Sequence, residues 1–208
     1  MNTYTGTLFI ISAASGSGKT SLVKALVNKI NNLVLSISHT TRSKRAAEQE
    51  GVDYFFISKE IFLEMQNNNQ FLESAIVFNN YYGTSKQFVL DQLKLGRDII
   101  LEIDYQGALK IKDYFSQLSH KSIFILPPSL QSLTERLNSR GQDDFLVIQQ
   151  RINNAKIEIR HYLNYDYLII NDNFDKAIED LSTIIYAERL TVNKQKDINA
   201  NLINSLLT

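Results

Sequence analysis

Patterns of buried strands and of amphipathic helices alternate along most of the chain. Continuous apolar runs are typical of strands buried on both faces, and they stand at 8–11, 33–38, 98–104, 122–126 and 166–172. Apolar residues recur at helical spacing between and after these runs, in 22–30, 85–96, 105–115, 129–141, 145–163 and 174–190. This alternation predicts an α/β fold: a parallel sheet with helices on both faces.

A segment in the first half of the chain interrupts this alternation. Its sequence predicts short strands at 53–58 and 71–78, with a short helix between them that Ser58 is placed to cap. We expect loops at 39–51, which is polar and basic at first, and at 79–85, which is rich in turn-forming residues.

The predicted organisation is a core domain with one insertion. Residues 1–36 and 85–208 form the core, and residues 37–84 form a small α+β region inserted into it. We expect the helix at 85–96 to end at Gly96, and the last long helix to begin at the cap Asn173.

The sequence SAASGSGKTS, residues 12–21, joins the first strand to the first helix. Gly16 and Gly18 let the backbone turn so that N–H groups point at phosphate oxygens, and the helix N-terminus adds partial positive charge. Lys19 supplies a full positive charge, and the Thr20 hydroxyl is positioned for Mg²⁺. The expected contacts to a nucleoside triphosphate are Ala14, Ser15, Gly16, Ser17, Gly18, Lys19, Thr20 and Ser21.

Ala13 stands where the usual phosphate-loop pattern has its first glycine, five positions before Gly18. That glycine eases the exit from the strand and does not face the phosphates. Alanine fits there if its φ is below zero. The loop by itself predicts a nucleotide and does not distinguish a kinase from a GTPase or an ATPase.

Overall charge and composition exclude several classes of partner and site. The 208 residues carry 22 basic and 22 acidic side chains, so no global field recruits nucleic acid or an anionic membrane. The absence of cysteine excludes disulfides, thiolate zinc sites and cysteine nucleophiles, and the three histidines lack metal-ligand spacing. We see no signal peptide and no run of membrane-span length, and we expect a soluble cytoplasmic protein.

A second anion site is indicated after the strand at 33–38. Arg42 and Arg45 are three residues apart, so two guanidinium groups could converge on one phosphate. Tyr54, Tyr81 and Tyr82 could add hydroxyl donors. The plainer alternative is a solvated basic loop.

Further charged residues stand where ligands bind in open α/β sheets. Glu102 and Asp104 are two apart on one strand, so they share a face, and Asp104 lies at the carboxyl end. Arg136 and Arg140 are four apart on one helix face, and Arg151 follows them. For the arginines alone, a solvated helix face is the competing interpretation.

Eight ordered motifs resemble those of guanylate kinases, the bacterial enzymes in particular. They are SHTTRSKR, EGVDYFF, FLES, NYYGTS, LEIDYQG, LPPS, RLNSRG and LIIND, and the resemblance runs from Gly6 to about Lys196. It implies a P-loop kinase core with a GMP-binding insertion and a helical lid at about residues 130–158. It also implies transfer of the γ-phosphoryl group of ATP to GMP, with Mg²⁺ as cofactor.

The resemblance carries roles to matching positions. Contacts to the GMP phosphate and its surroundings are implied for Ser38, Arg42, Arg45, Tyr54 and Tyr82, with Ser38 near the base. Glu73 and Thr84 are implied as guanine readers, and we assign Asp104, supported by Glu102, to the acceptor site and the Mg²⁺ water shell. The lid arginines are Arg136, Arg140 and Arg151, and Asn171 matches a position near the adenine.

Guanine chemistry agrees with these roles. Guanine presents two adjacent donors, N1–H and the exocyclic amine, and the Glu73 carboxylate can accept both, whereas a hydroxyl of Thr84 or Ser38 can donate to O6. Adenine would leave buried polar groups unpaired. An acceptor that is already a phosphate anion requires no general base, so catalysis should consist of positioning, charge neutralisation and water exclusion by Lys19, Arg42, the lid arginines and Asp104.

Two other functions remain as alternatives to the kinase. One is a non-catalytic guanylate-kinase-like module that binds proteins, although such modules typically degrade the phosphate loop that is intact here. The other is a kinase of the same fold with a different phosphorylated acceptor, which would need no base reader.

A homo-oligomer is also left open, since the leucines after Leu190 could serve an interface or pack on the core. Departures from the family pattern, whose effects stay open, are Ala13, Ala14, Lys44 and Ala47.

Overall fold

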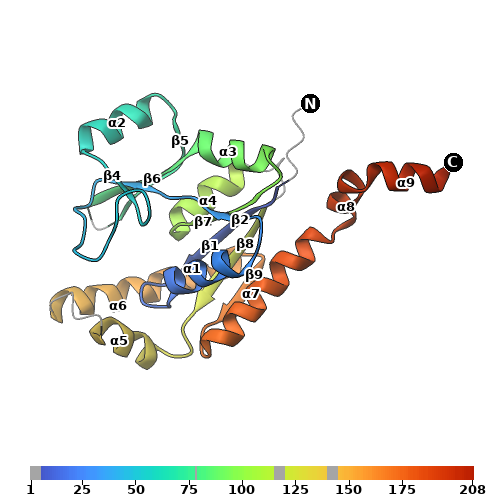
Figure 1. The fold of residues 1–208 in the computed structure, drawn as a ribbon. Coiled ribbons are helices and arrows are strands. Elements are labelled where there is room, and N and C mark those ends of the chain that lie inside the picture. The colour runs from blue at the N-terminus through green and yellow to red at the C-terminus, as the bar shows by residue number, and fades with distance from the viewer. Residues whose placement is uncertain (1–5, 78, 115–119, 140–144) are drawn as a thin grey trace.

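The computed structural model describes residues 6–77, 79–114, 120–139 and 145–208 (Figure 1). Within them lies a parallel sheet of five strands in the order β2-β7-β1-β8-β9, which confirms the predicted α/β class. The strands are β1 (Leu8–Ala13), β2 (Leu33–Leu35), β7 (Asp98–Glu102), β8 (His120–Leu126) and β9 (Tyr167–Ile170).

Alternate residues of β1 enter two separate apolar layers. Phe9 and Ile11 pack with α1 (Lys19–Lys29) and α7 (Phe174–Arg189) on one face. Leu8 and Ile10 pack with α3 (Lys86–Lys94) and α4 (Tyr105–Tyr114) on the other. All four β1 side chains are fully buried, which explains why this strand is a continuous apolar run and not an alternating one.

The interrupting segment forms a second sheet beside the core, above it in Figure 1. Its described strands pair in the order β4-β3-β6-β5. They are β3 (His39–Thr40), β4 (Phe55–Phe56), β5 (Phe71–Val77) and β6 (Asn80–Ser85), with α2 (Lys59–Asn67) between β4 and β5. As predicted, Ser58 caps α2, because its hydroxyl accepts the Ile61 N–H.

Three secondary-structure predictions in this region were wrong. Residues 79–85 are mostly the strand β6, because Tyr81, Tyr82 and Thr84 favour a pleated surface and β5 supplies an antiparallel partner. The predicted loop at 39–51 begins with the short strand β3, which pairs with β6 and β4. The strand predicted at 33–38 ends at Leu35, where its pairing with β7 also ends.

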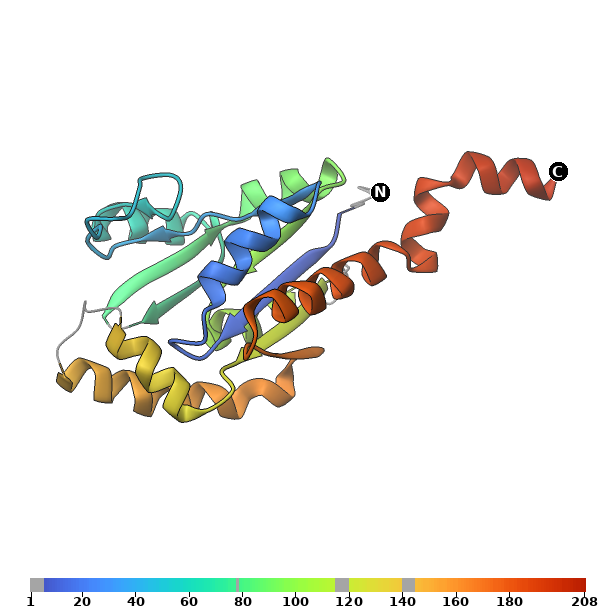
Figure 2. The same cartoon turned by 60° about the horizontal axis from the view of Figure 1, so that its bottom comes forward.

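Two helices cover the end of the core sheet that carries the glycine-rich loop (Figure 2). They are α5 (Leu130–Ser139), which begins after the cap Ser129, and α6 (Phe145–Ile159), which passes into a 3-10 turn, η1 (Arg160–Asn164). Leu133 and Leu137 of α5 pack with Ala155 of α6 and with Ala14 of the loop. A separate small core therefore attaches these helices to the loop.

The chain ends in two short helices that project from the body in Figure 1. They are α8 (Val192–Ile198) and α9 (Ala200–Leu207), and no residue of either is buried. Leu202, Leu206 and Leu207 are largely exposed. Across the described residues, no helix combines the length and the apolar character needed to cross a membrane.

Candidate nucleotide-binding site

The glycine-rich loop leaves β1 at the carboxyl edge of the sheet and turns directly into α1. Gly16 and Gly18 have φ values of +91° and +87°, a region that glycine enters without steric cost. Among the described residues, only Asn32, Asn69 and Asn79 have positive φ without being glycine. Ala13 ends β1, and its φ is not positive. Alanine therefore fits at this position, as the sequence analysis required.

Side chains from distant elements brace this loop from behind. The Asn171 Nδ2 donates to the Ser17 carbonyl at 2.7 Å, and the Arg136 Nη2 donates to the Asn171 carbonyl at 2.9 Å. A Cβ on Gly18 would lie 2.6 Å from the same Asn171 amide nitrogen. Asn171 and Arg136 therefore fix the loop's shape in this structure, and neither lines the cavity described below.

The polar side chains of the loop reach the end of the neighbouring strand β7. The Lys19 Nζ donates to the Ile103 carbonyl at 2.9 Å, and the Thr20 hydroxyl donates to the Glu102 carboxylate. Asp104 accepts the Gly107 N–H at 2.9 Å and so caps the start of α4. Because β1 and β7 are parallel neighbours, their carboxyl ends bring these groups together.

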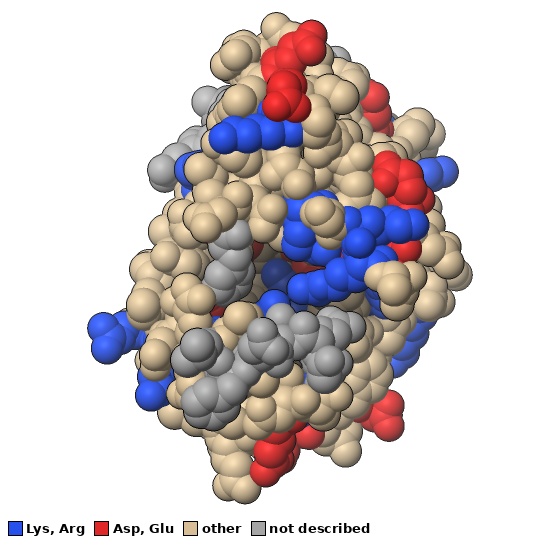
Figure 3. All heavy atoms as spheres, turned by 90° about the vertical axis from the view of Figure 1, so that its left-hand side faces the viewer, with Lys and Arg blue, Asp and Glu red and all other residues tan. Residues whose placement is uncertain are grey.

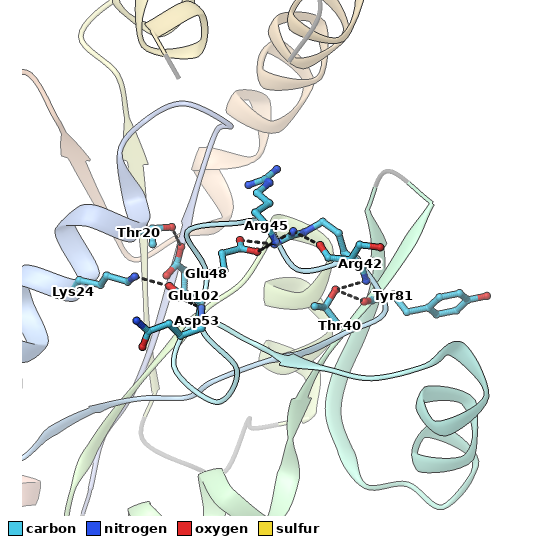
Figure 4. Close-up of polar contacts among 11 residues, drawn as sticks. Thr20, Lys24, Thr40, Arg42, Arg45, Glu48, Asp53, Tyr81 and Glu102 are labelled. Carbon is cyan, nitrogen blue, oxygen red and sulfur yellow. Dashed lines mark hydrogen bonds and ion pairs between the residues drawn. The ribbon is translucent and has the colours of Figure 1, made fainter. Parts of the chain in front are cut away.

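Across the cavity, one carboxylate holds the two arginines of the basic loop (Figure 4). Glu48 accepts from the Arg42 Nη2 at 2.7 Å, from the Arg42 Nη1 at 3.1 Å and from the Arg45 backbone N–H at 2.8 Å. Burial alone would lower the pKa of Arg42, but hydrogen bonds to Glu48 and Tyr82 outweigh it, and that pKa is raised. Burial and the nearby Glu102 charge raise the pKa of Tyr54 to about 12, so its hydroxyl stays protonated.

Glu73 is a buried carboxylate on β5, and its side chain meets β6 and α4. The fully buried Thr84 hydroxyl donates to Glu73 Oε1 at 2.6 Å. Burial raises the pKa of Glu73 to about 7, with a smaller contribution from Asp104 in the same direction. A Cβ on Gly107 would lie 2.6 Å from Glu73 Oε2, so glycine at this position leaves room for the carboxylate.

The glycine-rich loop, the two arginines of the basic loop and the Glu73 carboxylate surround one cavity of about 930 Å³. The predicted residues that line it are Ala14, Ser15, Gly16, Ser17, Gly18, Lys19, Thr20, Ser21, Ser38, Arg42, Arg45, Tyr54, Glu73, Tyr82, Glu102, Asp104 and Arg151. Thr84, Arg136 and Asn171 lie behind its wall, and Arg140 falls outside the described residues. Figure 3 looks into the hollow and shows lysine and arginine side chains gathered around it.

Three contacts of the site were not anticipated from the sequence. Glu48 holds the arginines, Glu158 of α6 accepts the Ser15 N–H at 2.9 Å, and Lys24 pairs with Asp53 at 2.6 Å between α1 and the second sheet's loop. Burial raises the pKa of Glu158. The sequence did indicate a place for Glu158 near the site. It lies seven residues after Arg151, so both side chains fall on the same face of a helix.

The described residues contain no cluster of three or more histidine, aspartate or glutamate side chains arranged to hold a metal. A metal at this site would therefore need oxygen atoms from the bound nucleotide or from water. The lysine and arginine side chains that line the cavity favour the binding of anions, and the buried Glu73 carboxylate adds a hydrogen-bond acceptor.

Comparisons with known proteins agree with this chemistry. The family model described as guanylate kinase matches residues 5–188. The guanylate kinase of Saccharophagus degradans is 53% identical over 206 residues, covering 99% of this chain and all of that protein, and that of Coxiella burnetii is 52% identical over 200 residues, covering 96% and 94%. A crystal structure of guanylate kinase from Anaplasma phagocytophilum has a TM-score of 0.76 at 33% identity and covers 90% of this chain and 88% of that one. Since the matches span nearly the whole length, and the loop, the arginine pair and the buried carboxylate share one cavity, this chain belongs to the guanylate kinase family.

Proposed function

We propose that this protein transfers the γ-phosphoryl group of ATP to GMP, giving ADP and GDP, with the residues of the cavity in the roles given below. The observation that carries these roles is that a phosphate loop and a second cationic site with a buried carboxylate line the same cavity. A single nucleotide would use only one of the two. Two nucleotides bound from opposite sides would bring their phosphates together between Lys19 and the Arg42–Arg45 pair.

On the acceptor side, Glu73 reads the guanine ring. Its carboxylate accepts N1–H and the exocyclic amine, and the Thr84 hydroxyl holds it in place from behind. Ser38, which lines the cavity, supplies the hydroxyl for O6. Arg42, Arg45, Tyr54 and Tyr82 bind the phosphate of GMP.

On the donor side, the backbone from Ala14 to Ser21 cradles the ATP phosphates. Lys19 leaves the Ile103 carbonyl and neutralises charge on the transferring group. Asn171 and Arg136 keep the loop in shape, and Arg151 of α6 reaches the cavity from the lid side. Arg140 belongs to the same lid in this proposal.

No side chain needs to remove a proton from the acceptor. The attacking oxygen belongs to a phosphate anion, so binding in line with the γ-phosphoryl group is sufficient to start the reaction. Approach of the second sheet and of α5 and α6 over both nucleotides would exclude water and suppress hydrolysis of ATP.

The residues present fit a magnesium ion bound with ATP. One hydroxyl, Thr20, and two carboxylates, Glu102 and Asp104, are oxygen donors, the type that Mg²⁺ prefers, and Mg²⁺ usually keeps several waters when it binds with phosphates. Thr20 would hold the ion directly, with Asp104 and Glu102 through water. When bound, the ion supplies charge neutralisation on the ATP phosphates.

An acceptor panel tests this proposal. ADP formation from ATP is measured with GMP, AMP, UMP and dTMP, and we expect GMP to exceed AMP in kcat/KM by at least about a thousandfold, since a hydrogen-bonding base site rejects mismatched bases strongly. Equal turnover of AMP would refute the role of Glu73. Turnover of a sugar phosphate in preference to GMP would favour the same-fold kinase instead.

A further inference from the structure

Glu48 joins the two arginines of the acceptor-phosphate site into one unit. Both of its carboxylate oxygens accept from Arg42, and one of them also accepts the backbone N–H of Arg45. The side chains of Glu48 and Arg42 are each only 16% exposed, so the pair is held away from bulk water. Figure 4 shows dashed lines that join Glu48 to both Arg45 and Arg42.

The contacts of Glu48 leave a particular edge of the Arg42 guanidinium for a ligand. Glu48 takes one N–H of Nη1 and one of Nη2, which form the end of the group, and the other Nη1 N–H donates to the Ser43 carbonyl at 2.8 Å. These bonds to Glu48 and Ser43 do not use the side edge, which consists of Nε–H and the second N–H of Nη2. Arg42 is also hydrogen-bonded to Tyr82, which lines the same cavity. The side edge matches two oxygens of one phosphate.

Two aromatic rings lie close to the same guanidinium and restrain it. The Arg42 Cζ lies 5.4 Å from the centroid of the Tyr54 ring and 5.8 Å from that of Phe56. A free arginine side chain loses rotamer entropy when it is ordered, and here the ordering precedes binding. The site thus gives up part of its positive charge, because Glu48 neutralises one guanidinium, and gains a fixed orientation.

We propose that Glu48 is a positioning residue for phosphate recognition: it directs the side edge of Arg42, and the backbone that carries Arg45, toward the phosphate of the acceptor nucleotide. This inference rests on the proposed assignment of Arg42 to the GMP phosphate. It makes Glu48 specific for the phosphate of GMP, with no part in binding guanine.

Calorimetric titrations with GMP and with guanosine test this role in Glu48→Ala, Arg42→Ala and the double variant. We expect Glu48→Ala to weaken GMP binding by about tenfold, the scale of one charge-assisted hydrogen bond, and to leave guanosine binding within about twofold. In the Arg42→Ala background, Glu48→Ala should cause a smaller loss than it does alone, because only its contact with the Arg45 backbone remains to be removed.

Controls separate this role from a folding defect. Glu48→Gln keeps the size of the side chain and one acceptor oxygen, so it should lose less GMP affinity than Glu48→Ala at an unchanged melting temperature. Glu64→Ala removes the same charge from an exposed position on α2 and should leave GMP binding unchanged.

Five results would overturn the proposal. Tighter GMP binding in Glu48→Ala would make Glu48 a competitor of the phosphate, and additive losses in the double variant would make it independent of Arg42. Weakened guanosine binding in Glu48→Gln would give it a general structural role. Unchanged GMP binding in Arg42→Ala alone would refute the assignment of Arg42 as well, whereas a loss there with none in Glu48→Ala would refute only the role of Glu48.

Discussion

Glu73 is a carboxylate in a buried environment that its residue type seldom occupies. A carboxylate buried at 6% exposure is costly unless partners satisfy it, and here Thr84 donates to it through its hydroxyl and through its backbone N–H. With a pKa of about 7, the group is half protonated near neutral pH in the ligand-free protein. Guanine would supply two further donors, which favour the ionised form. Binding of the base and ionisation of Glu73 are therefore linked.

This linkage predicts a pH dependence for guanosine, a ligand that has no phosphate to titrate. Below about pH 7 Glu73 is protonated and must lose its proton before it accepts both guanine donors, so affinity should rise with pH and level off above that value. Between pH 5.5 and 7.5 we expect a gain of more than about tenfold, measured by calorimetry in two buffers to count released protons. A flat profile, or a slope retained in Glu73→Gln, would contradict the linkage.

At the scale of elements, the base site is formed where three of them meet. The strand β5 carries Glu73, the neighbouring strand β6 carries Thr84, and α4 approaches closely through Gly107. The same Gly107 donates its N–H to Asp104, so the start of α4 connects the acceptor-side carboxylates. Close packing of α4 on β5 is thus a condition for the position of Glu73.

Gly107→Ala tests this packing. The added Cβ would lie 2.6 Å from Glu73 Oε2 and must displace the carboxylate or the helix. We expect the KM for GMP to rise by about tenfold or more, with the KM for ATP within about twofold, in steady-state assays. Leu109→Ala, at an exposed position on the same helix, should alter neither constant. Equal losses for both substrates would point to a general disturbance of the core.

At the scale of the whole molecule, two bodies share the site and the C-terminal helices lie apart from it. The core sheet carries the phosphate loop, and the second sheet carries the acceptor residues. Lys24 and Asp53 form an ion pair between α1 and the loop before β4. The helices α8 and α9 line no part of the cavity, and the leucines of α9 are exposed and do not pack on the core.

Deletion of residues 200–208 should therefore leave catalysis intact. No residue of α9 is buried, so we expect kcat/KM for both substrates within about twofold of the full chain and a melting temperature within a few degrees. Light scattering on the same two proteins tests the remaining interpretation of the exposed leucines: a fall in molar mass on truncation would assign α9 to contacts between copies. A large loss of activity in a protein of unchanged mass would contradict the independence of α9 from the site.

Much of the molecule follows from its sequence, because local rules and tertiary context agree there. The order of core strands and helices follows from apolar periodicity, and the phosphate loop follows from two glycines whose positive φ no other residue type adopts as readily. The caps Ser58, Ser129 and Asn173 behave as their positions indicate, since an N-cap bond involves only neighbours in the chain.

Tertiary structure decided what depends on partners far away in the sequence. Residues 79–85 include residue types that favour turns, yet most of them form the strand β6 because β5 pairs with it. Asn171 braces the Ser17 carbonyl 154 positions away, and Glu158 reaches Ser15 from 143 positions away, distances over which no periodicity carries information. The sequence by itself determined which chemical groups are available to the site, and long-range packing determined which of them face the cavity and which support it from behind.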